Sequence, residues 1–237
     1  GARSKVFVDD ALLNMFQDTA LTRRYEPRVI ADVPEFQQLA ETLKQRQHIA
    51  ILDIGGGEGV ASAELIGKLL QLMGRTDVQI VLTLFETEDR KALYAQHLER
   101  AFPGRVALTF GGLLEQESEL ERYDLIIALH SLYALADSTR DTDHWSGPAL
   151  LLQKLQASLT QDGKIVASLA SGSGVSAAYK RLCMQELFGR VVQDFTFEEL
   201  IETWRPTSRK IVDSYFLFSS NERGWVTREM AVAWVKY

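Results

Sequence analysis

The sequence predicts an α/β protein with a doubly wound, mostly parallel sheet that follows an N-terminal helical segment. Three observations support this prediction. Short apolar runs alternate with helical patterns from residue 48 onward. Several of these runs are apolar at almost every position, as are strands buried on both faces of a parallel sheet. A glycine cluster follows the first run, and the length of 237 residues suits one such domain.

The first region of the chain is expected to be helical and to form a lid over the main domain. Pro27 should break this region, and Pro34 suits the first turn of its second helix. The apolar side chains of that second helix fall on one face: Phe36, Leu39, Ala40 and Leu43. We therefore divide the chain into a helical lid, residues 1–47, and a main domain, residues 48–237.

The main domain is expected to alternate strands with helices. The predicted strands are residues 48–54, 78–85, 105–110, 123–129, 164–170 and 211–218. The predicted helices are residues 58–73, 90–102, 148–159, 177–188, 196–203 and 227–235. Gly74 should end the first of these helices, and turns are expected at Pro103 and Gly104 and at residues 161–163. Ligands of such sheets bind beyond the carboxyl ends of the strands, where the strand order reverses.

The strongest signal for a ligand is the glycine cluster Asp53-Ile54-Gly55-Gly56-Gly57-Glu58-Gly59. Glycines let the backbone turn sharply and approach a ligand, and the amino end of the next helix attracts anions. The ligand is either a dinucleotide pyrophosphate or the methionine carboxylate of a sulfonium cofactor. The dinucleotide pattern G-x-G-x-x-G fails, because Val60 or Ser62 stands where its last glycine should be. The methyltransferase pattern D/E-x-G-x-G-x-G fits at every fixed position: Asp53, Gly55, Gly57 and Gly59.

Two acidic residues accompany this loop. Glu86 ends the second predicted strand, 27 residues after Gly59. A carboxylate at that place can accept hydrogen bonds from both ribose hydroxyls of an adenosine cofactor, and the alternative is a solvated strand-end acid. Asp53 ends the first predicted strand, where it either holds the loop through backbone N–H groups or faces the ammonium of the cofactor.

Together these residues resemble the class I S-adenosylmethionine-dependent methyltransferases, which have a Rossmann-like fold. The chain is similar in particular to the histamine N-methyltransferase group of small-molecule methyltransferases. Three segments carry that resemblance: Ile54-Gly55-Gly56-Gly57-Glu58-Gly59, Leu129-His130-Ser131-Leu132-Tyr133-Ala134-Leu135 and Ser171-Gly172-Ser173-Gly174.

The resemblance implies roles for individual residues. Glu86 would bind the ribose, and Leu129, at the end of the fourth predicted strand, would touch the cofactor. His130 would face the methyl acceptor, Tyr133 would line its pocket or pack in the core, and Glu35 would meet a substrate amine. The methionine part of S-adenosylmethionine would bind at the loop formed by Asp53, Gly55, Gly56, Gly57 and Gly59.

The chain departs from this family at two points. His130 stands where the histamine enzyme has an amide, which speaks against histamine as the substrate. The family also adds a further antiparallel strand beside the fifth, whereas this chain ends at Tyr237. The sheet is therefore expected to lack its last strand, to be completed by a neighbouring domain or chain, or to differ in topology.

The chemistry of methyl transfer gives His130 a second possible role. Displacement at a sulfonium mainly requires that the acceptor be aligned with the methyl group. An amine acceptor must also lose a proton, which a neutral imidazole can take. His130 is thus either a catalytic base or a hydrogen-bonding pocket wall. The four histidines and one cysteine lack metal-ligand spacing, so no metal is predicted.

The predicted function is S-adenosylmethionine-dependent methyl transfer to nitrogen or oxygen of a small molecule, with S-adenosylhomocysteine as the product. The alternatives are a methyltransferase domain acting on a carrier-tethered intermediate, a cofactor-binding module without catalysis and, least favoured, a dehydrogenase. The net charge of −6 argues against a broad nucleic-acid surface. We expect no membrane span and no signal peptide, and hence a cytoplasmic protein.

Overall fold

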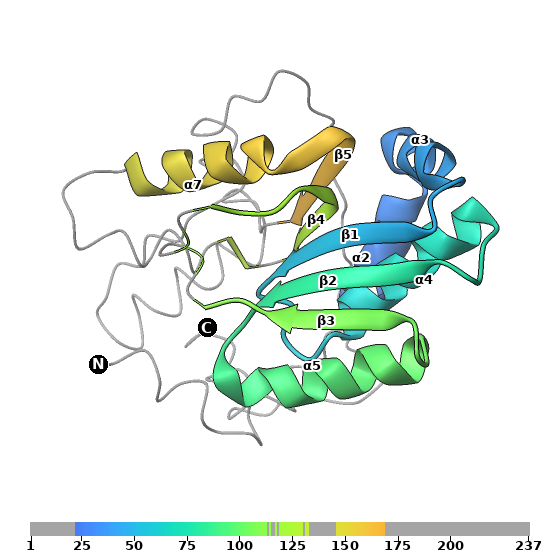
Figure 1. Ribbon diagram of the computed structural model, residues 1–237, viewed down its shortest axis with the longest axis horizontal. Coiled ribbons are helices and arrows are strands. Elements are labelled where there is room, and N and C mark those ends of the chain that lie inside the picture. The colour runs from blue at the N-terminus through green and yellow to red at the C-terminus, as the bar shows by residue number, and fades with distance from the viewer. Residues whose placement is uncertain are drawn as a thin grey trace, which may run out of the picture.

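The computed structural model describes residues 22–112, 114, 117, 119–129, 131, 132 and 146–168. Their centre is a five-stranded parallel sheet in the order β3-β2-β1-β4-β5, with flanking helices (Figure 1). This confirms the predicted doubly wound α/β architecture. The strands are β1 (His48–Ile54), β2 (Gln79–Phe85), β3 (Val106–Phe110), β4 (Tyr123–Leu129) and β5 (Leu159–Ser168). The helices are α2 (Thr22–Ala31), α3 (Pro34–Leu43), α4 (Val60–Met73), α5 (Glu88–Ala101) and α7 (Ser146–Ala157).

The strand order reverses at β1, which pairs with β2 on one side and with β4 on the other. Residue 54 at the end of β1 lies opposite Phe85 at the end of β2. The segments that follow these strands, 55–59 and the residues from Glu86, therefore begin side by side at one edge of the sheet. This is the switch point at which ligands of doubly wound sheets bind.

The two faces of the sheet bury separate apolar clusters. One cluster joins β1, β2 and β4 to α2, α3, α4 and α5, and the other joins the sheet to α7. Side chains alternate along β1, so that Ile49 and Ile51 belong to the first cluster while Leu52 and Ile54 belong to the second. By the same alternation Asp53 faces α4 and α5. The core thus directs this carboxylate toward the first turn of α4, which follows the loop, and toward the middle of α5.

The N-terminal helices that the structure describes, from residue 22 on, agree with the prediction except at Pro27, and residues 1–21 lie outside the described residues. We expected Pro27 to end a helix, but α2 continues through it. Proline removes one backbone donor, yet Pro27 is buried and α2 packs along α4, so tertiary packing outweighs the local cost. Pro34 does lie in the first turn of α3, as predicted. The expected apolar face is buried: Phe36, Leu39, Ala40 and Leu43.

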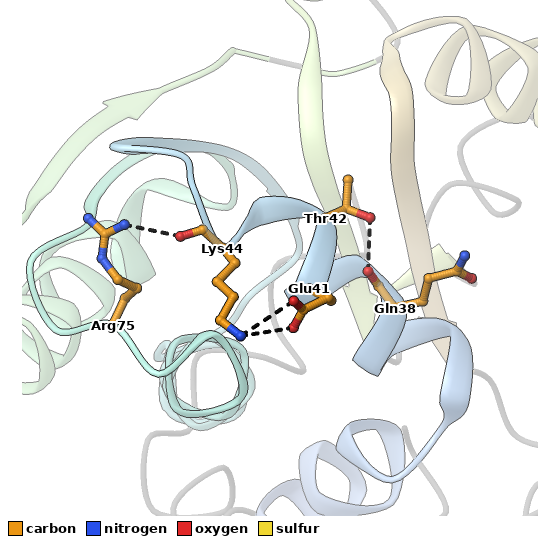
Figure 2. Close-up of polar contacts among 5 residues, drawn as sticks. All are labelled: Gln38, Glu41, Thr42, Lys44 and Arg75. Carbon is orange, nitrogen blue, oxygen red and sulfur yellow. Dashed lines mark hydrogen bonds and ion pairs between the residues drawn. The ribbon is translucent and has the colours of Figure 1, made fainter.

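Polar contacts fix the carboxyl end of α3 against the end of α4 (Figure 2). The Arg75 Nη1 atom donates a hydrogen bond of 3.0 Å to the carbonyl oxygen of Lys44. The Lys44 ammonium lies 3.2 Å from the carboxylate of Glu41, and the Thr42 hydroxyl donates to the Gln38 carbonyl at 2.9 Å. The chain therefore enters β1 from a helix end that is bonded to the segment after α4.

The start of β5 differs from the prediction. We expected a helix up to residue 159, a turn at 161–163 and a strand from Lys164, but α7 ends at residue 157 and β5 already begins at Leu159. Leu159 lies opposite Tyr123 and Lys164 opposite Leu125, so five steps along β5 match two along β4. The predicted turn residues form a bulge inside the strand, not a connection between elements.

The bulge has identifiable causes. A Cβ atom on Gly163 would lie 2.7 Å from the carbonyl oxygen of Tyr123, so the two backbones approach more closely than a side chain allows. The Thr160 hydroxyl donates to Asp124 Oδ1 at 3.0 Å, while Asp124 Oδ2 accepts from the Ala50 N–H at 3.0 Å. Turn and bulge use the same residue types, which explains why the pattern predicted a turn.

Several predicted elements lie outside the described residues. They are the helices at 177–188, 196–203 and 227–235, the strand at 211–218 and the last two residues of the strand at 164–170. In the part of the chain that the structure describes, no helix is long and apolar enough to cross a membrane.

Candidate functional site

The loop between β1 and α4 has the backbone that its glycines predict. Gly55, Gly57 and Gly59 have φ angles of +66°, +60° and +81°, in the left-handed region that other residues rarely adopt. The Gly55 N–H donates to the Phe85 carbonyl at 2.8 Å, and the Gly59 N–H donates to the Gly56 carbonyl at 3.0 Å. No side chain caps α4 at Gly59, so its first backbone N–H groups stay available to a ligand.

Glu86, directly after β2, is bonded to this loop. Its Oε2 atom accepts a hydrogen bond of 2.6 Å from the Gly57 N–H. Its Oε1 atom accepts from the N–H of Thr87 at 2.7 Å and from the Thr87 hydroxyl at 3.0 Å. The structure therefore brings the glycine loop and the predicted acidic partner into direct contact, across 29 positions of sequence.

Asp53 lies beneath the loop with its carboxylate buried. The Tyr94 hydroxyl of α5 donates a hydrogen bond of 2.6 Å to Asp53 Oδ2. Burial raises the pKa of Asp53 to about 6, although the hydroxyls of Ser62 and Tyr94 act in the opposite direction. A Cβ atom on Gly56 would lie only 2.5 Å from Asp53 Oδ2. Of the two roles predicted for Asp53, this geometry favours support of the loop over contact with an ammonium group.

Tyr94 is a site residue that the sequence analysis did not single out. It is fully buried, and burial, together with the nearby charge of Asp53, raises the pKa of its hydroxyl well above the usual value. Its spacing of four from Leu98 in α5 indicated a core position, and both residues are buried. Nothing in the sequence pattern indicated its contact with Asp53, because the two residues are 41 positions apart.

The end of β4 forms a third side of the candidate site. Leu129 is half-buried and packs against the first apolar cluster. A Cβ atom on Gly55 would lie 2.5 Å from the Cβ atom of Ser131, so the segment after β4 touches the loop. The Ser131 hydroxyl is buried and has no hydrogen-bond partner among the described residues. His130 and Tyr133, the predicted acceptor-side residues, lie outside the described residues.

Glu35 is not brought into contact with the loop. It lies in the first turn of α3, which Figure 1 shows at the end of the sheet where β1 begins. Its Oε2 atom is buried and has no hydrogen-bond partner in the described ranges. No hydrogen bond or ion pair between described residues links Glu35 to Glu86 or to the glycines. Its contact with a substrate amine stays a prediction.

No protein-family model and no curated protein matches the sequence. Solved structures do resemble the chain. An O-methyltransferase family protein from Burkholderia thailandensis is similar with a TM-score of 0.55 and 14% identity, over 84% of this chain and 55% of that one. The plantazolicin methyltransferase BpumL, solved with S-adenosylhomocysteine, has a TM-score of 0.47 and 15% identity, over 84% of this chain and 63% of that one.

The N-methyltransferase NodS from Bradyrhizobium japonicum, also solved with S-adenosylhomocysteine, has a TM-score of 0.44 and 18% identity, over 82% of this chain and 84% of that one. The chain spans less than two thirds of the length of the first two proteins. At these identities the likeness shows the fold alone. The described part of the chain has the Rossmann-like methyltransferase fold.

Proposed function

We propose that this chain is a methyltransferase that uses S-adenosylmethionine to methylate nitrogen or oxygen of a small molecule. The observation that carries the proposal is the bond between the Gly57 N–H and the Glu86 carboxylate, 2.6 Å long, at the switch point of a methyltransferase fold. It joins a glycine-rich loop to an acid that can accept hydrogen bonds from ribose hydroxyls. These are the two features that an adenosine sulfonium cofactor requires.

The residues of the loop fit this cofactor in a specific way. The backbone of Gly55, Gly56, Gly57 and Gly59 would contact the methionine part, and the uncapped amino end of α4 would attract its carboxylate. Glu86 orients the ribose, and Leu129 would provide an apolar contact. Bound there, S-adenosylmethionine supplies a methyl group that is already activated on a sulfonium. The protein then has to hold the acceptor in line and exclude water.

The acceptor side of the proposal rests on the sequence. His130 would follow Leu129 into the pocket and take the proton of an amine or form a polar wall. Tyr133 would line the same pocket, whereas Glu35 lies at the other end of the sheet from the loop and is not part of this proposal. The resemblance to the histamine N-methyltransferase group supports a small acceptor, and His130 in place of the amide of that group speaks against histamine. The role of residues 1–47 as a lid belongs to the same proposal.

Calorimetric titration tests the cofactor assignment directly. We expect the purified chain to bind S-adenosylmethionine and S-adenosylhomocysteine with Kd values on the order of micromolar, and not to bind NADH. Binding of NADH alone would replace the proposal with a dehydrogenase. Binding of S-adenosylmethionine without methylation of free amines, alcohols or carrier-tethered acceptors would favour a non-catalytic module. Methylation of the carrier-tethered acceptor alone would place the activity in a biosynthetic assembly.

Substitution of Glu86 by alanine should weaken cofactor binding about 10- to 100-fold, or about 1–3 kcal/mol, because hydrogen bonds to a charged group are lost. The Gly57 N–H loses its acceptor in the same variant. The matched control is Glu88→Ala, which removes an exposed carboxylate only two positions away that pairs with Lys91 at 2.8 Å. Equal affinities of both variants and the wild type would remove Glu86 from the ribose site.

A further inference from the structure

A buried polar pair lies beneath the loop and is not explained by contact with the cofactor. Tyr94 is 0% exposed and Asp53 is 1% exposed, and a hydrogen bond of 2.6 Å joins them. Burying a carboxylate costs free energy that the hydroxyls of Tyr94 and Ser62 only partly offset, because the pKa of Asp53 is still raised. An apolar pair of the same shape would stabilise the core at least as well. The pair therefore calls for a role other than core stability.

The ring of Tyr94 supports the loop directly. A Cβ atom on Gly56 would lie 2.5 Å from the Tyr94 Cε2 atom, and a Cβ atom on Gly59 would lie 3.1 Å from its Cδ2 atom. The backbone at both ends of the segment 56–59 therefore rests on this one ring. Gly57, between them, is held separately by its bond to Glu86. The position of the ring thus sets the position of the backbone that meets Glu86.

We propose that Tyr94 is a positioning residue of the cofactor site, which holds the glycine loop through its ring and through its hydroxyl bond to Asp53. The inference rests on the proposed function for its effect on binding, but its effect on the loop does not depend on any ligand. Tyr94 is fully buried beneath the loop, so it would not contact a ligand bound above the loop. It acts through Asp53 and the backbone of Gly56.

The charged and titratable surroundings of Asp53 give this proposal a signature in pH. Tyr94 faces Asp53 from α5, Ser62 from α4 and Glu86 from the end of β2. The Tyr94 hydroxyl lowers the pKa of Asp53, whereas the charge of Glu86 raises it. Removing the hydroxyl should therefore move the pKa of Asp53 upward from about 6, toward neutral pH. Any change in the loop that is caused by ionisation of Asp53 should then occur at a higher pH.

The test compares Tyr94→Phe with Tyr123→Phe. Both variants lose one hydroxyl from a buried ring, but Tyr123 lies at the start of β4, at the opposite end of the sheet from the loop. Affinity for S-adenosylhomocysteine is measured from pH 5.5 to 8.5, and hydrogen–deuterium exchange of the peptide 53–60 is measured without ligand. Far-ultraviolet circular dichroism confirms that each variant is folded.

We expect Tyr94→Phe to bind S-adenosylhomocysteine about tenfold more weakly than the wild type. Its peptide 53–60 should exchange faster, and its affinity should change at a higher pH. Tyr123→Phe should match the wild type in all three. Asp53→Asn, which keeps an acceptor for the Tyr94 hydroxyl, should retain the slow exchange. Unchanged exchange in Tyr94→Phe overturns the inference, even if the wild type binds. A wild type that binds no S-adenosylhomocysteine defeats the proposed function, while the exchange data still decide the role of Tyr94.

Discussion

The Gly57→Val variant is expected to lose measurable binding of S-adenosylmethionine and S-adenosylhomocysteine, a decrease on the order of 100-fold or more. Gly57 has a φ angle of +60°, which a β-branched residue adopts only with strain. Relief of that strain moves the Gly57 N–H away from Glu86, to which it donates at 2.6 Å. A valine side chain would also block the close approach of the methionine part of the cofactor to the backbone of the loop. Calorimetric titration at neutral pH measures the loss.

Gly74→Val is the matched control for this variant. Gly74 has a φ angle of +66° at the carboxyl end of α4, and a Cβ atom there would meet nothing within 4 Å. The same backbone strain is thus introduced far from the loop. We expect Gly74→Val to lower the melting temperature but to bind like the wild type. Retained binding in Gly57→Val, or equal loss in both variants, would reject the glycine loop as the cofactor cradle.

Asp53→Asn is expected to change how stability depends on pH. Burial raises the pKa of Asp53 from 3.8 to about 6, so the folded state binds this proton more tightly than the unfolded state does. The proton on Asp53 therefore stabilises the folded state below pH 3.8, and this stabilisation is lost as the pH rises through 6. The loss amounts to about 3 kcal/mol in the wild type. The amide of the Asp53→Asn variant does not titrate, so the variant does not lose this stability as the pH rises. The amide can still accept a hydrogen bond from Tyr94.

Urea unfolding of both proteins at pH 4, 5, 6 and 7 measures this effect. The free energy of unfolding of Asp53→Asn, relative to the wild type, should rise between pH 4 and 6 and level off between pH 6 and 7. Asp77→Asn is the control, because the neighbouring Arg75 lowers the pKa of Asp77 below 3.8. Asp77 is therefore ionised in both the folded and the unfolded state from pH 4 to 7, and the difference between Asp77→Asn and the wild type should stay nearly constant. A constant difference between wild type and Asp53→Asn at every pH would contradict the burial argument.

Apolar runs were the part of the fold that could be predicted best. The bounds of β1 and β4 agree with the prediction at every residue, because both strands are buried on two faces and their apolar runs end where the sheet ends. The helix α4 ends at Gly74 as expected, with Gly74 in the left-handed conformation. It begins two residues later than predicted, at Val60, since the loop continues through Gly59.

Features that depend on distant contacts were predicted less well. Pro27 stays helical because of packing along α4, which no local pattern records. The predicted turn forms a bulge because Gly163 lies against Tyr123, and Thr160 bonds to Asp124 of the neighbouring strand. The contact between Tyr94 and Asp53 likewise requires that α5 and β1 be placed first. The glycine loop and Glu86 could be located because each follows a strand that the sequence predicts clearly.

The hydrogen bonds already made by Glu86 determine how it could recognise a ribose in the proposed function. Its carboxylate accepts three of them, from the Gly57 N–H and from the N–H and hydroxyl of Thr87. A carboxylate has about four acceptor sites, so two incoming hydroxyls exceed the number that is free. Of the three donors, the Thr87 hydroxyl alone can rotate away, and it would turn to water as a ribose arrives. In the proposed function, recognition of a ribose at Glu86 is then an exchange of hydrogen-bond partners, and it discriminates against ligands that lack the two hydroxyls.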